Sequence, residues 1–138
     1  MFNDLDAYNK IMLESNPKQC KNIGKTVKDF DAAKWDAVKQ QIVFHATYEK
    51  FSQNYELHRV LILTGNKTLA EASPYDKIWG IGLIASEHNA KISEKWEGQN
   101  LLGQSLMEVR HILDMEDRRL EICELGVHAA TDYPDQDN

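Results

Sequence analysis

The stretch 73-SPYDKIWGIGL-83 interrupts a chain whose other segments mostly carry helix signals. It opens with a serine-proline turn signal, and Gly80 and Gly82 follow shortly after Asp76 and Trp79. Glycine is unfavourable inside helices and strands unless the backbone adopts a positive φ or something approaches it closely. The stretch therefore predicts an irregular, glycine-bearing segment with an acid and an indole beside a point of close approach.

Helix signals flank this segment on both sides. Asn16 followed by Pro17 is typical of an N-cap with proline at the first helical position, and Gly24 is typical of a helix end. Apolar spacing predicts helices over residues 4–14, 17–24, 32–53, 57–62 and from 101 onward. The expected buried stripes are Trp35, Val38, Ile42, Ala46 and Phe51 in the third helix, and Leu102, Leu106, Val109 and Leu113 in the last. Residues 68–72 are a candidate for a short extended piece, and the fold class is mainly α.

Length and composition indicate one soluble domain. The 138 residues are 42% hydrophobic and 28% charged, which is ordinary for a globular protein large enough to bury a core. The sequence shows no apolar run of membrane-spanning length and no signal peptide before the first expected helix. Cys20 and Cys123 lie far apart without metal-ligand spacing, so neither a disulfide framework nor a zinc site is indicated. We expect a cytoplasmic protein.

Charge is concentrated at one end of the sequence. The last 25 residues carry eight acids and two arginines, which accounts for the whole net charge of −6. This balance provides no global basic field for nonspecific nucleic-acid binding. A local basic cluster, which is most simply a solvated helix face, comprises Lys18, Lys21, Lys25 and Lys28. The final residues, 130–138, are expected to fray.

The familiar catalytic and cofactor motifs do not occur. The sequence lacks a phosphate-binding loop, a dinucleotide fingerprint, a zinc-protease motif and a nucleophile elbow, and its five histidines lack metal-ligand spacing. No cofactor and no metal are predicted. Ser105 is better explained by helix packing than as a nucleophile.

The segment around Asp76 and Trp79 fits a chemical role and a structural one. An indole can stack on a flat ring while a carboxylate stabilises the oxocarbenium-like state of glycosidic cleavage or activates water. In the structural alternative, Trp79 fills the core and Asp76 caps a turn. The residues of this stretch alone leave both open.

Five sequence motifs follow one another along the chain and together span most of residues 5–113. They are WDAVK at 35–39, KFSQN at 50–54, LILTGNKTLAEAS at 61–73, DKIWGIGL at 76–83 and WEGQNLLGQSLMEVR at 96–110. This pattern resembles the NADAR, or YbiA-like, family of N-glycosidases. The resemblance implies cleavage of ribosylated or ADP-ribosylated bases, including riboflavin-pathway intermediates and, in some branches, ADP-ribosylated guanine in DNA.

The resemblance also implies which residues form the site. Asp76 is the implied catalytic residue, and the implied substrate-binding residues are Trp35, Trp79, Gly80, Gly82, Asn100 and Lys25. Gly80 and Gly82 are expected to let the ligand come close. Lys25 stands where family members often carry an arginine near a phosphate, and it offers a weaker point charge.

In the family, a section with short strands and a glutamate-bearing SEH…KF motif precedes the first helix expected here. Ser86-Glu87-His88 matches three of those letters inside a different loop, and we interpret it as coincidence. We accordingly expect residues 1–113 to be the C-terminal portion of a NADAR domain that becomes α+β when the strands are supplied. Residues 114–138 are expected to form the end of the last helix and an acidic tail.

Two functions follow from this expectation. The chain is either part of an active N-glycosidase, completed by another polypeptide, or a non-catalytic binder of ADP-ribose-like ligands. Apolar surface at residues 5–12 and 78–84 is expected to remain uncovered, which favours self-association or recruitment of an N-terminal polypeptide. The expected partner is a small-molecule substrate, with no membrane, and nucleic acid only if the substrate is ADP-ribosylated DNA.

Overall fold

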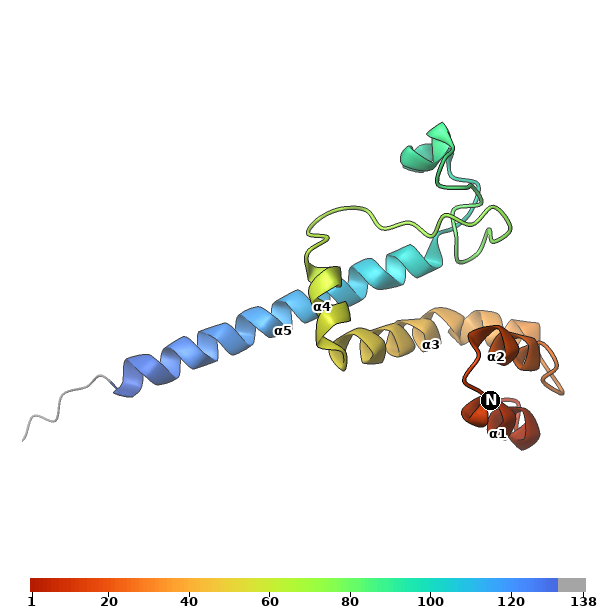
Figure 1. The fold of residues 1–138 in the computed structure, drawn as a ribbon, viewed down its shortest axis with the longest axis horizontal. Coiled ribbons are helices and arrows are strands. Elements are labelled where there is room, and N and C mark those ends of the chain that lie inside the picture. Colours follow the sequence, from red (N-terminus) through yellow and green to blue (C-terminus); the bar gives the residue numbers. More distant parts are fainter. Residues whose placement is uncertain (132–138) are drawn as a thin grey trace, which may run out of the picture. The chain divides into compact units, whose positions relative to one another are not determined.

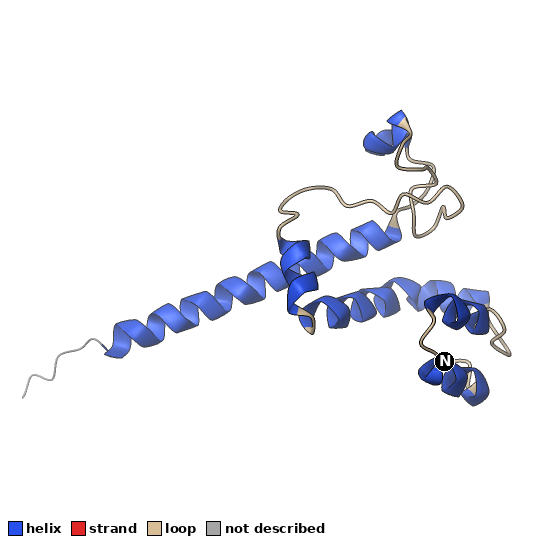
Figure 2. Ribbon diagram, viewed as in Figure 1, coloured by secondary structure: helices blue, strands red, loops and turns tan. Residues whose placement is uncertain are grey.

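The computed structural model of the chain describes the backbone of residues 1–131 and the side chains of residues 1–123. The chain divides into two compact units, Met1–Lys39 and Gln40–Asn138, and the boundary lies inside a helix. Helices and loops make up the described part, which contains no strand (Figure 2). The mainly α prediction is confirmed. The extended piece expected at residues 68–72 is absent, and these residues form irregular loop.

The first unit contains α1 (Leu5–Leu13), α2 (Pro17–Gly24) and the start of α3 (Ala32–Ser52) (Figure 1). The predicted caps form, since the Asn16 side chain accepts from the backbone N–H groups of Lys18 and Gln19. Asp4 caps α1 through Ala7 N at 3.0 Å and also accepts from Lys28 N at 2.9 Å. These backbone hydrogen bonds hold the pKa of the Asp4 carboxyl below its ordinary value.

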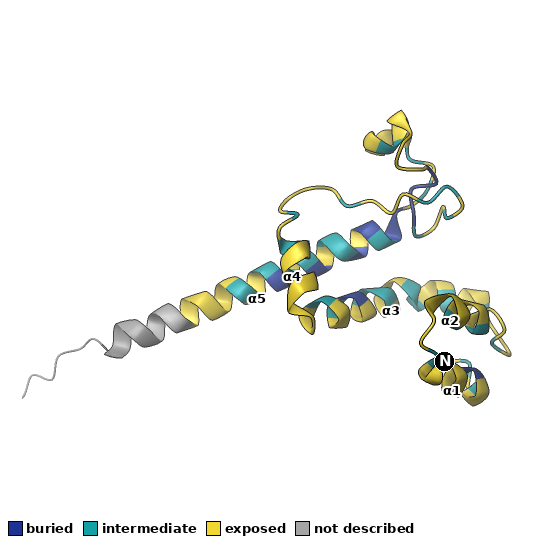
Figure 3. Ribbon diagram, viewed as in Figure 1, coloured by how far each residue is buried: buried dark blue, intermediate teal, exposed yellow. Residues whose placement is uncertain are grey.

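The second unit contains the rest of α3, α4 (Tyr55–Ile62), two short 3-10 helices, η1 (His88–Lys91) and η2 (Ser93–Lys95), and α5 (Leu101–Thr131). Its core consists of Leu61, Val109 and Leu113, with partly buried apolar residues packed around them. The stripe predicted on the last helix is confirmed by the burial of Val109 and Leu113 and the packing of Leu106. Figure 3 shows burial concentrated in the first half of α5.

The stripe predicted on α3 is wrong in its central part. Ile42 is 40% exposed and Ala46 is also exposed. The residues that face the core there lie one to two positions further along, at Phe44, Thr47 and Tyr48, whereas Phe51 packs against the core as predicted. Both sets have helical spacing, so periodicity alone does not select the face that tertiary packing buries.

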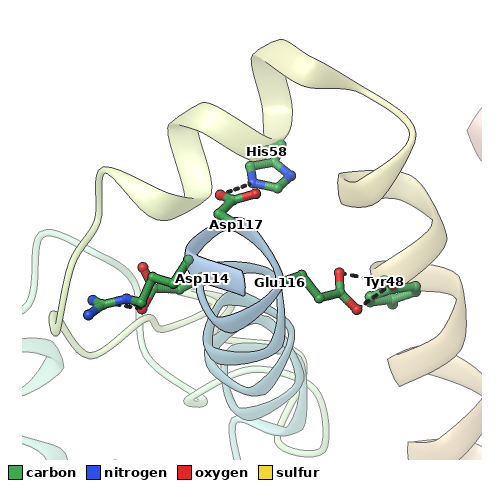
Figure 4. Close-up of polar contacts among 6 residues, drawn as sticks. Tyr48, His58, Asp114, Glu116 and Asp117 are labelled. Carbon is green, nitrogen blue, oxygen red and sulfur yellow. Dashed lines mark hydrogen bonds and ion pairs between the residues drawn. The ribbon is translucent and has the colours of Figure 1, made fainter. Parts of the chain in front are cut away.

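Polar contacts hold α3 and α4 against one turn of α5 (Figure 4). The Tyr48 hydroxyl donates to both carboxylate oxygens of Glu116, at 3.0 and 3.1 Å, and this bond raises the pKa of the Tyr48 hydroxyl. His58 Nε2 lies 2.8 Å from Asp117 Oδ2. These two contacts join α5 to α3 and to α4 at neighbouring positions, Glu116 and Asp117.

Candidate functional site

The segment between α4 and α5 is a tightly hydrogen-bonded loop. Backbone carbonyls of residues 77–81 accept from N–H groups of residues 97–102. The contacts are Gln99 N to Lys77 O, Asn100 N to Gly80 O, Leu101 N to Ile78 O, Leu102 N to Trp79 O, and Glu97 N and Gly98 N to Ile81 O, all between 2.8 and 3.1 Å. Helix N-termini leave N–H groups without intrahelical partners. Here the loop that carries the predicted site provides those partners for α5.

Glycines make this close backbone packing feasible. A Cβ on Gly80 would lie 2.8 Å from Asp76 O and 2.9 Å from Glu71 O. Gly82 has φ +74°, and its Cβ would lie 3.0 Å from that of Glu97. The predicted close approach at Gly80 and Gly82 therefore exists, and the group that approaches is the chain's own backbone and the Glu97 side chain. Their contact with a ligand stays a prediction.

Asn100 is buried at the centre of the loop and its side chain joins two distant segments. Its amide donates to Leu69 O at 2.9 Å, and its Oδ1 accepts from Glu71 N at 3.0 Å. Its φ is +55°, a left-handed conformation that asparagine tolerates better than most residues. Asn100 thus joins the loop residues 69–71 to the start of α5.

We expect Asn100→Ala to lower the free energy of unfolding by about 2 kcal/mol, because two backbone groups lose their partner and alanine disfavours this φ. Chemical denaturation followed by tryptophan fluorescence measures the loss. Asn100→Gly separates the causes, since glycine accepts the φ but cannot make either bond. A glycine variant as stable as wild type would show that the side-chain bonds contribute nothing.

Asp76 lies at the turn that precedes Trp79. Its Oδ1 accepts from Ile78 N at 3.0 Å and from Trp79 N at 2.8 Å, so the carboxylate forms the turn cap that the sequence left open as an alternative. Its Oδ2 has no hydrogen-bond partner among the described residues. Asp76 is half-buried, and a free carboxylate oxygen remains for chemistry.

The structure brings four predicted residues together with Asp76 in this loop: Trp79, Gly80, Gly82 and Asn100. Trp79 is half-buried, while Ile81 and Leu83 beside it are buried. The apolar surface expected over residues 78–84 is therefore exposed only at its ends, at Ile78 and Ile84. Ile81 is buried because the backbone packs closely at the glycines on either side of it, Gly80 and Gly82.

The other two predicted residues belong to the first unit. Trp35 is half-buried in the first turn of α3, and Lys25 is the exposed C-cap of α2. Most apolar residues of α1 are exposed as expected, with Leu5 at 71% and Met12 at 65%, whereas Ala7 is buried and Ile11 is half-buried. The expected fraying of residues 130–138 falls almost wholly outside the described residues.

Glu87 of the Ser86-Glu87-His88 match has a local role. Its carboxylate accepts from Ile84 N at 3.0 Å, one residue before η1 begins. This contact favours our interpretation of the match as coincidence. Two further glycines, Gly98 and Gly103, also pack closely but were not predicted as site residues. A Cβ on Gly98 would lie 2.9 Å from Ile81 C, and a Cβ on Gly103 would lie 2.6 Å from Asn100 Oδ1. Their place in the motif at 96–110 is the signal that points to them.

The geometry defines a helical protein whose last helix is capped at its N-terminus by this loop. Comparison with known proteins gives the family. The model of the NADAR domain matches residues 1–114. The chain is 46% identical over 110 residues to N-glycosidase R617 of Acanthamoeba polyphaga mimivirus, covering 80% of this chain and 65% of that protein. The chain belongs to the NADAR family.

Two further relatives show how widely the domain is shared. Protein irg-1 of Caenorhabditis elegans is 35% identical over 115 residues, 82% of this chain and 54% of that protein. The chloroplastic riboflavin biosynthesis protein PYRR of Zea mays is 30% identical over 109 residues, 76% of this chain and 16% of that protein. The chain thus spans at most about two thirds of these relatives.

Within the described residues, no helix combines the length and apolar character needed to cross a membrane.

Proposed function

We propose that this chain takes part in N-glycosidase activity on a ribosylated or ADP-ribosylated base. The observation that carries this proposal is the family match over residues 1–114, together with 46% identity to a protein named as an N-glycosidase. The riboflavin-related name of the Zea mays relative favours a riboflavin-pathway intermediate, and ADP-ribosyl-guanine is the other candidate substrate.

Asp76 is the proposed catalytic carboxylate. Its free Oδ2 is available to stabilise positive charge on the sugar or to activate water, while Oδ1 keeps the turn in place. Trp79, half-buried above this turn, is proposed to stack on the base. The hydrogen bond from Trp79 N to Asp76 Oδ1 joins the two residues, so one turn would position both the indole and the carboxylate.

The remaining substrate-binding proposals differ in what supports them. Asn100, Gly80 and Gly82 act by shaping the loop, because their contacts in the structure are with backbone and neighbouring side chains. Trp35 as a second aromatic surface and Lys25 as a phosphate contact rest on the family motif.

The cellular setting is also proposed. We infer a cytoplasmic protein whose partner is a small-molecule substrate, with DNA as partner only if ADP-ribosylated guanine is the substrate. The exposed apolar residues of α1 favour self-association or binding of an N-terminal polypeptide that completes the site.

A second function is favoured by one observation. The Asp76 carboxylate already serves the fold as a turn cap, so the loop is structurally complete without catalysis. The alternative is a non-catalytic module that binds ADP-ribose or a related nucleotide.

A hydrolysis assay separates the two functions. The 138-residue chain is incubated with a ribosylated riboflavin-pathway intermediate and with an ADP-ribosylated guanine oligonucleotide, alone and together with the part of the mimivirus relative that the match does not cover. The full mimivirus protein is the reference. Release of free base in either arm supports the N-glycosidase. Binding of ADP-ribose, measured by calorimetry, without release of base supports the alternative. If the chain neither releases base nor binds ADP-ribose, both proposed functions are contradicted.

We expect Trp79→Ala to weaken binding of an ADP-ribose-like ligand by about 1–3 kcal/mol through lost stacking. This corresponds to a rise in Kd of roughly 5- to 150-fold. Titration calorimetry measures it, and Trp79→Phe, which keeps an aromatic face, is the matched control and should lose less. Equal affinity in wild type and Trp79→Ala would remove Trp79 from the site.

A further inference from the structure

A groove lies between α4 and the middle of α5, within the second unit. It has a volume of about 460 Å³, and none of its residues belongs to the substrate site proposed above. The His58–Asp117 contact of 2.8 Å, drawn in Figure 4, joins its two walls. The lining comes from both helices and the C-cap of α4: Tyr55, His58, Arg59, Ile62, Leu63, Asp117, Leu120 and Glu121.

Large apolar side chains in this groove are exposed. Tyr55 is 74% exposed, Leu63 is 71% exposed and Leu120 is 62% exposed. Leu120 follows the buried Leu113 by seven residues, so the face of α5 that packs in the core continues into the groove. Exposed apolar residues that gather on one surface mark an interaction site, whereas scattered ones do not.

The α5 helix continues past the part of the chain that the family model matches. The match ends at residue 114, whereas α5 ends at Thr131. Figure 3 shows α5 changing from largely buried to largely exposed along its length, and residues 118–123 are all exposed. Helices in proteins gain most of their stability from the packing of an apolar face. A partner that covers Leu120 would supply this packing.

Charge selects a second copy of the chain as that partner. Arg59 on α4 and Glu121 on α5 both line the groove. Neither forms an ion pair among the described residues. In a two-fold dimer the same patch of both subunits meets, so each contact occurs twice. A patch with one unpaired charge of each sign therefore complements itself.

We propose that this groove is a homodimer interface, in which α5 of each copy lies against the groove of the other around a two-fold axis near Leu120. Leu120 then packs beside Tyr55 and Leu63 of the partner subunit, and Arg59 pairs with Glu121 of the partner subunit. This surface is separate from the exposed residues of α1, and the proposal does not rest on N-glycosidase activity.

Sedimentation velocity of the 138-residue chain over a range of concentrations tests the proposal. We expect wild type to pass from the mass of one chain to that of two. Leu120→Asp should raise the Kd of the dimer about 100-fold, because it places two like charges at the axis. Its Tm, measured at a dilution where wild type is monomeric, should be unchanged because Leu120 is exposed there. Leu5→Asp, on α1, is the matched control and should dimerise as wild type does.

Two results of this experiment would overturn the proposal. One is a chain that stays monomeric at every concentration. The other is a dimer that survives Leu120→Asp, including one that only Leu5→Asp disrupts.

A charge exchange tests the two-fold arrangement. Arg59→Glu and Glu121→Arg each place like charges opposite one another, so each should raise the Kd of the dimer about tenfold. The double variant restores opposite charges with their signs exchanged and should return the Kd to near that of wild type. A double variant that dimerises no better than the single variants would overturn the pairing. No arm of this test requires release of base, so its outcome and that of the hydrolysis assay are independent.

Discussion

Gly103→Ala should lower the free energy of unfolding by about 2–4 kcal/mol, although alanine is normally the better helix former. Gly103 lies in the first turn of α5, where an added Cβ would collide with Leu69 O and lie 2.6 Å from Asn100 Oδ1. These are the groups that join residues 69–71 to the helix start. The new methyl group therefore displaces the Asn100 bonds together with the backbone they hold.

Gly24→Ala is the matched control, because it makes the same change at a helical glycine in α2. No heavy atom lies within 4 Å of the Cβ it would add. Alanine there should leave stability unchanged or raise it by about 0.4–1 kcal/mol. Urea denaturation measures both variants. If Gly103→Ala matched Gly24→Ala, the packing of the loop against α5 would be looser than the structure shows.

The helices could be predicted from the sequence because their signals are local. Asn16, Pro17 and Gly24 give the bounds of α2 through capping chemistry that acts within a few residues. The α5 stripe was predicted for a similar reason, since Leu106, Val109 and Leu113 lie on one helical face. On α3 this reasoning failed, because two candidate faces had helical spacing and contacts with α4 and α5 decided which one is buried.

The loop shows where prediction from a single sequence ends. Gly80 and Gly82 correctly indicated a close approach, but glycine does not specify what approaches, and the structure places backbone and Glu97 there. The groove between residues 40–44 of α3 and 101–108 of α5 could not be foreseen, because it requires the pairing of two helices some sixty residues apart in the sequence. Ser105 is buried in α5, which fits its interpretation as a packing residue, and its hydroxyl has no hydrogen-bond partner among the described residues.

Asp76 is the residue at which structure and proposed chemistry are hardest to separate. One oxygen of its carboxylate holds the turn before Trp79, and the other is free. Asparagine at this position retains a carbonyl oxygen that can accept from Ile78 N and Trp79 N, so the turn should persist. What asparagine lacks is the negative charge and the capacity to take a proton.

Asp76→Asn should therefore reduce kcat by roughly 10²- to 10⁴-fold, the usual contribution of a general acid or base, with little change in KM or in the Tm. Release of base is measured in the same preparation, alone or complemented, in which wild type is active. Glu87→Gln is the control, since that carboxylate lies in the same loop and also accepts a backbone N–H. Asp76→Ala removes both the charge and the cap, so it should lose activity and stability together. If Asp76→Asn kept full activity while Asp76→Ala lost stability, Asp76 would be a turn cap only, and the catalytic carboxylate would lie elsewhere.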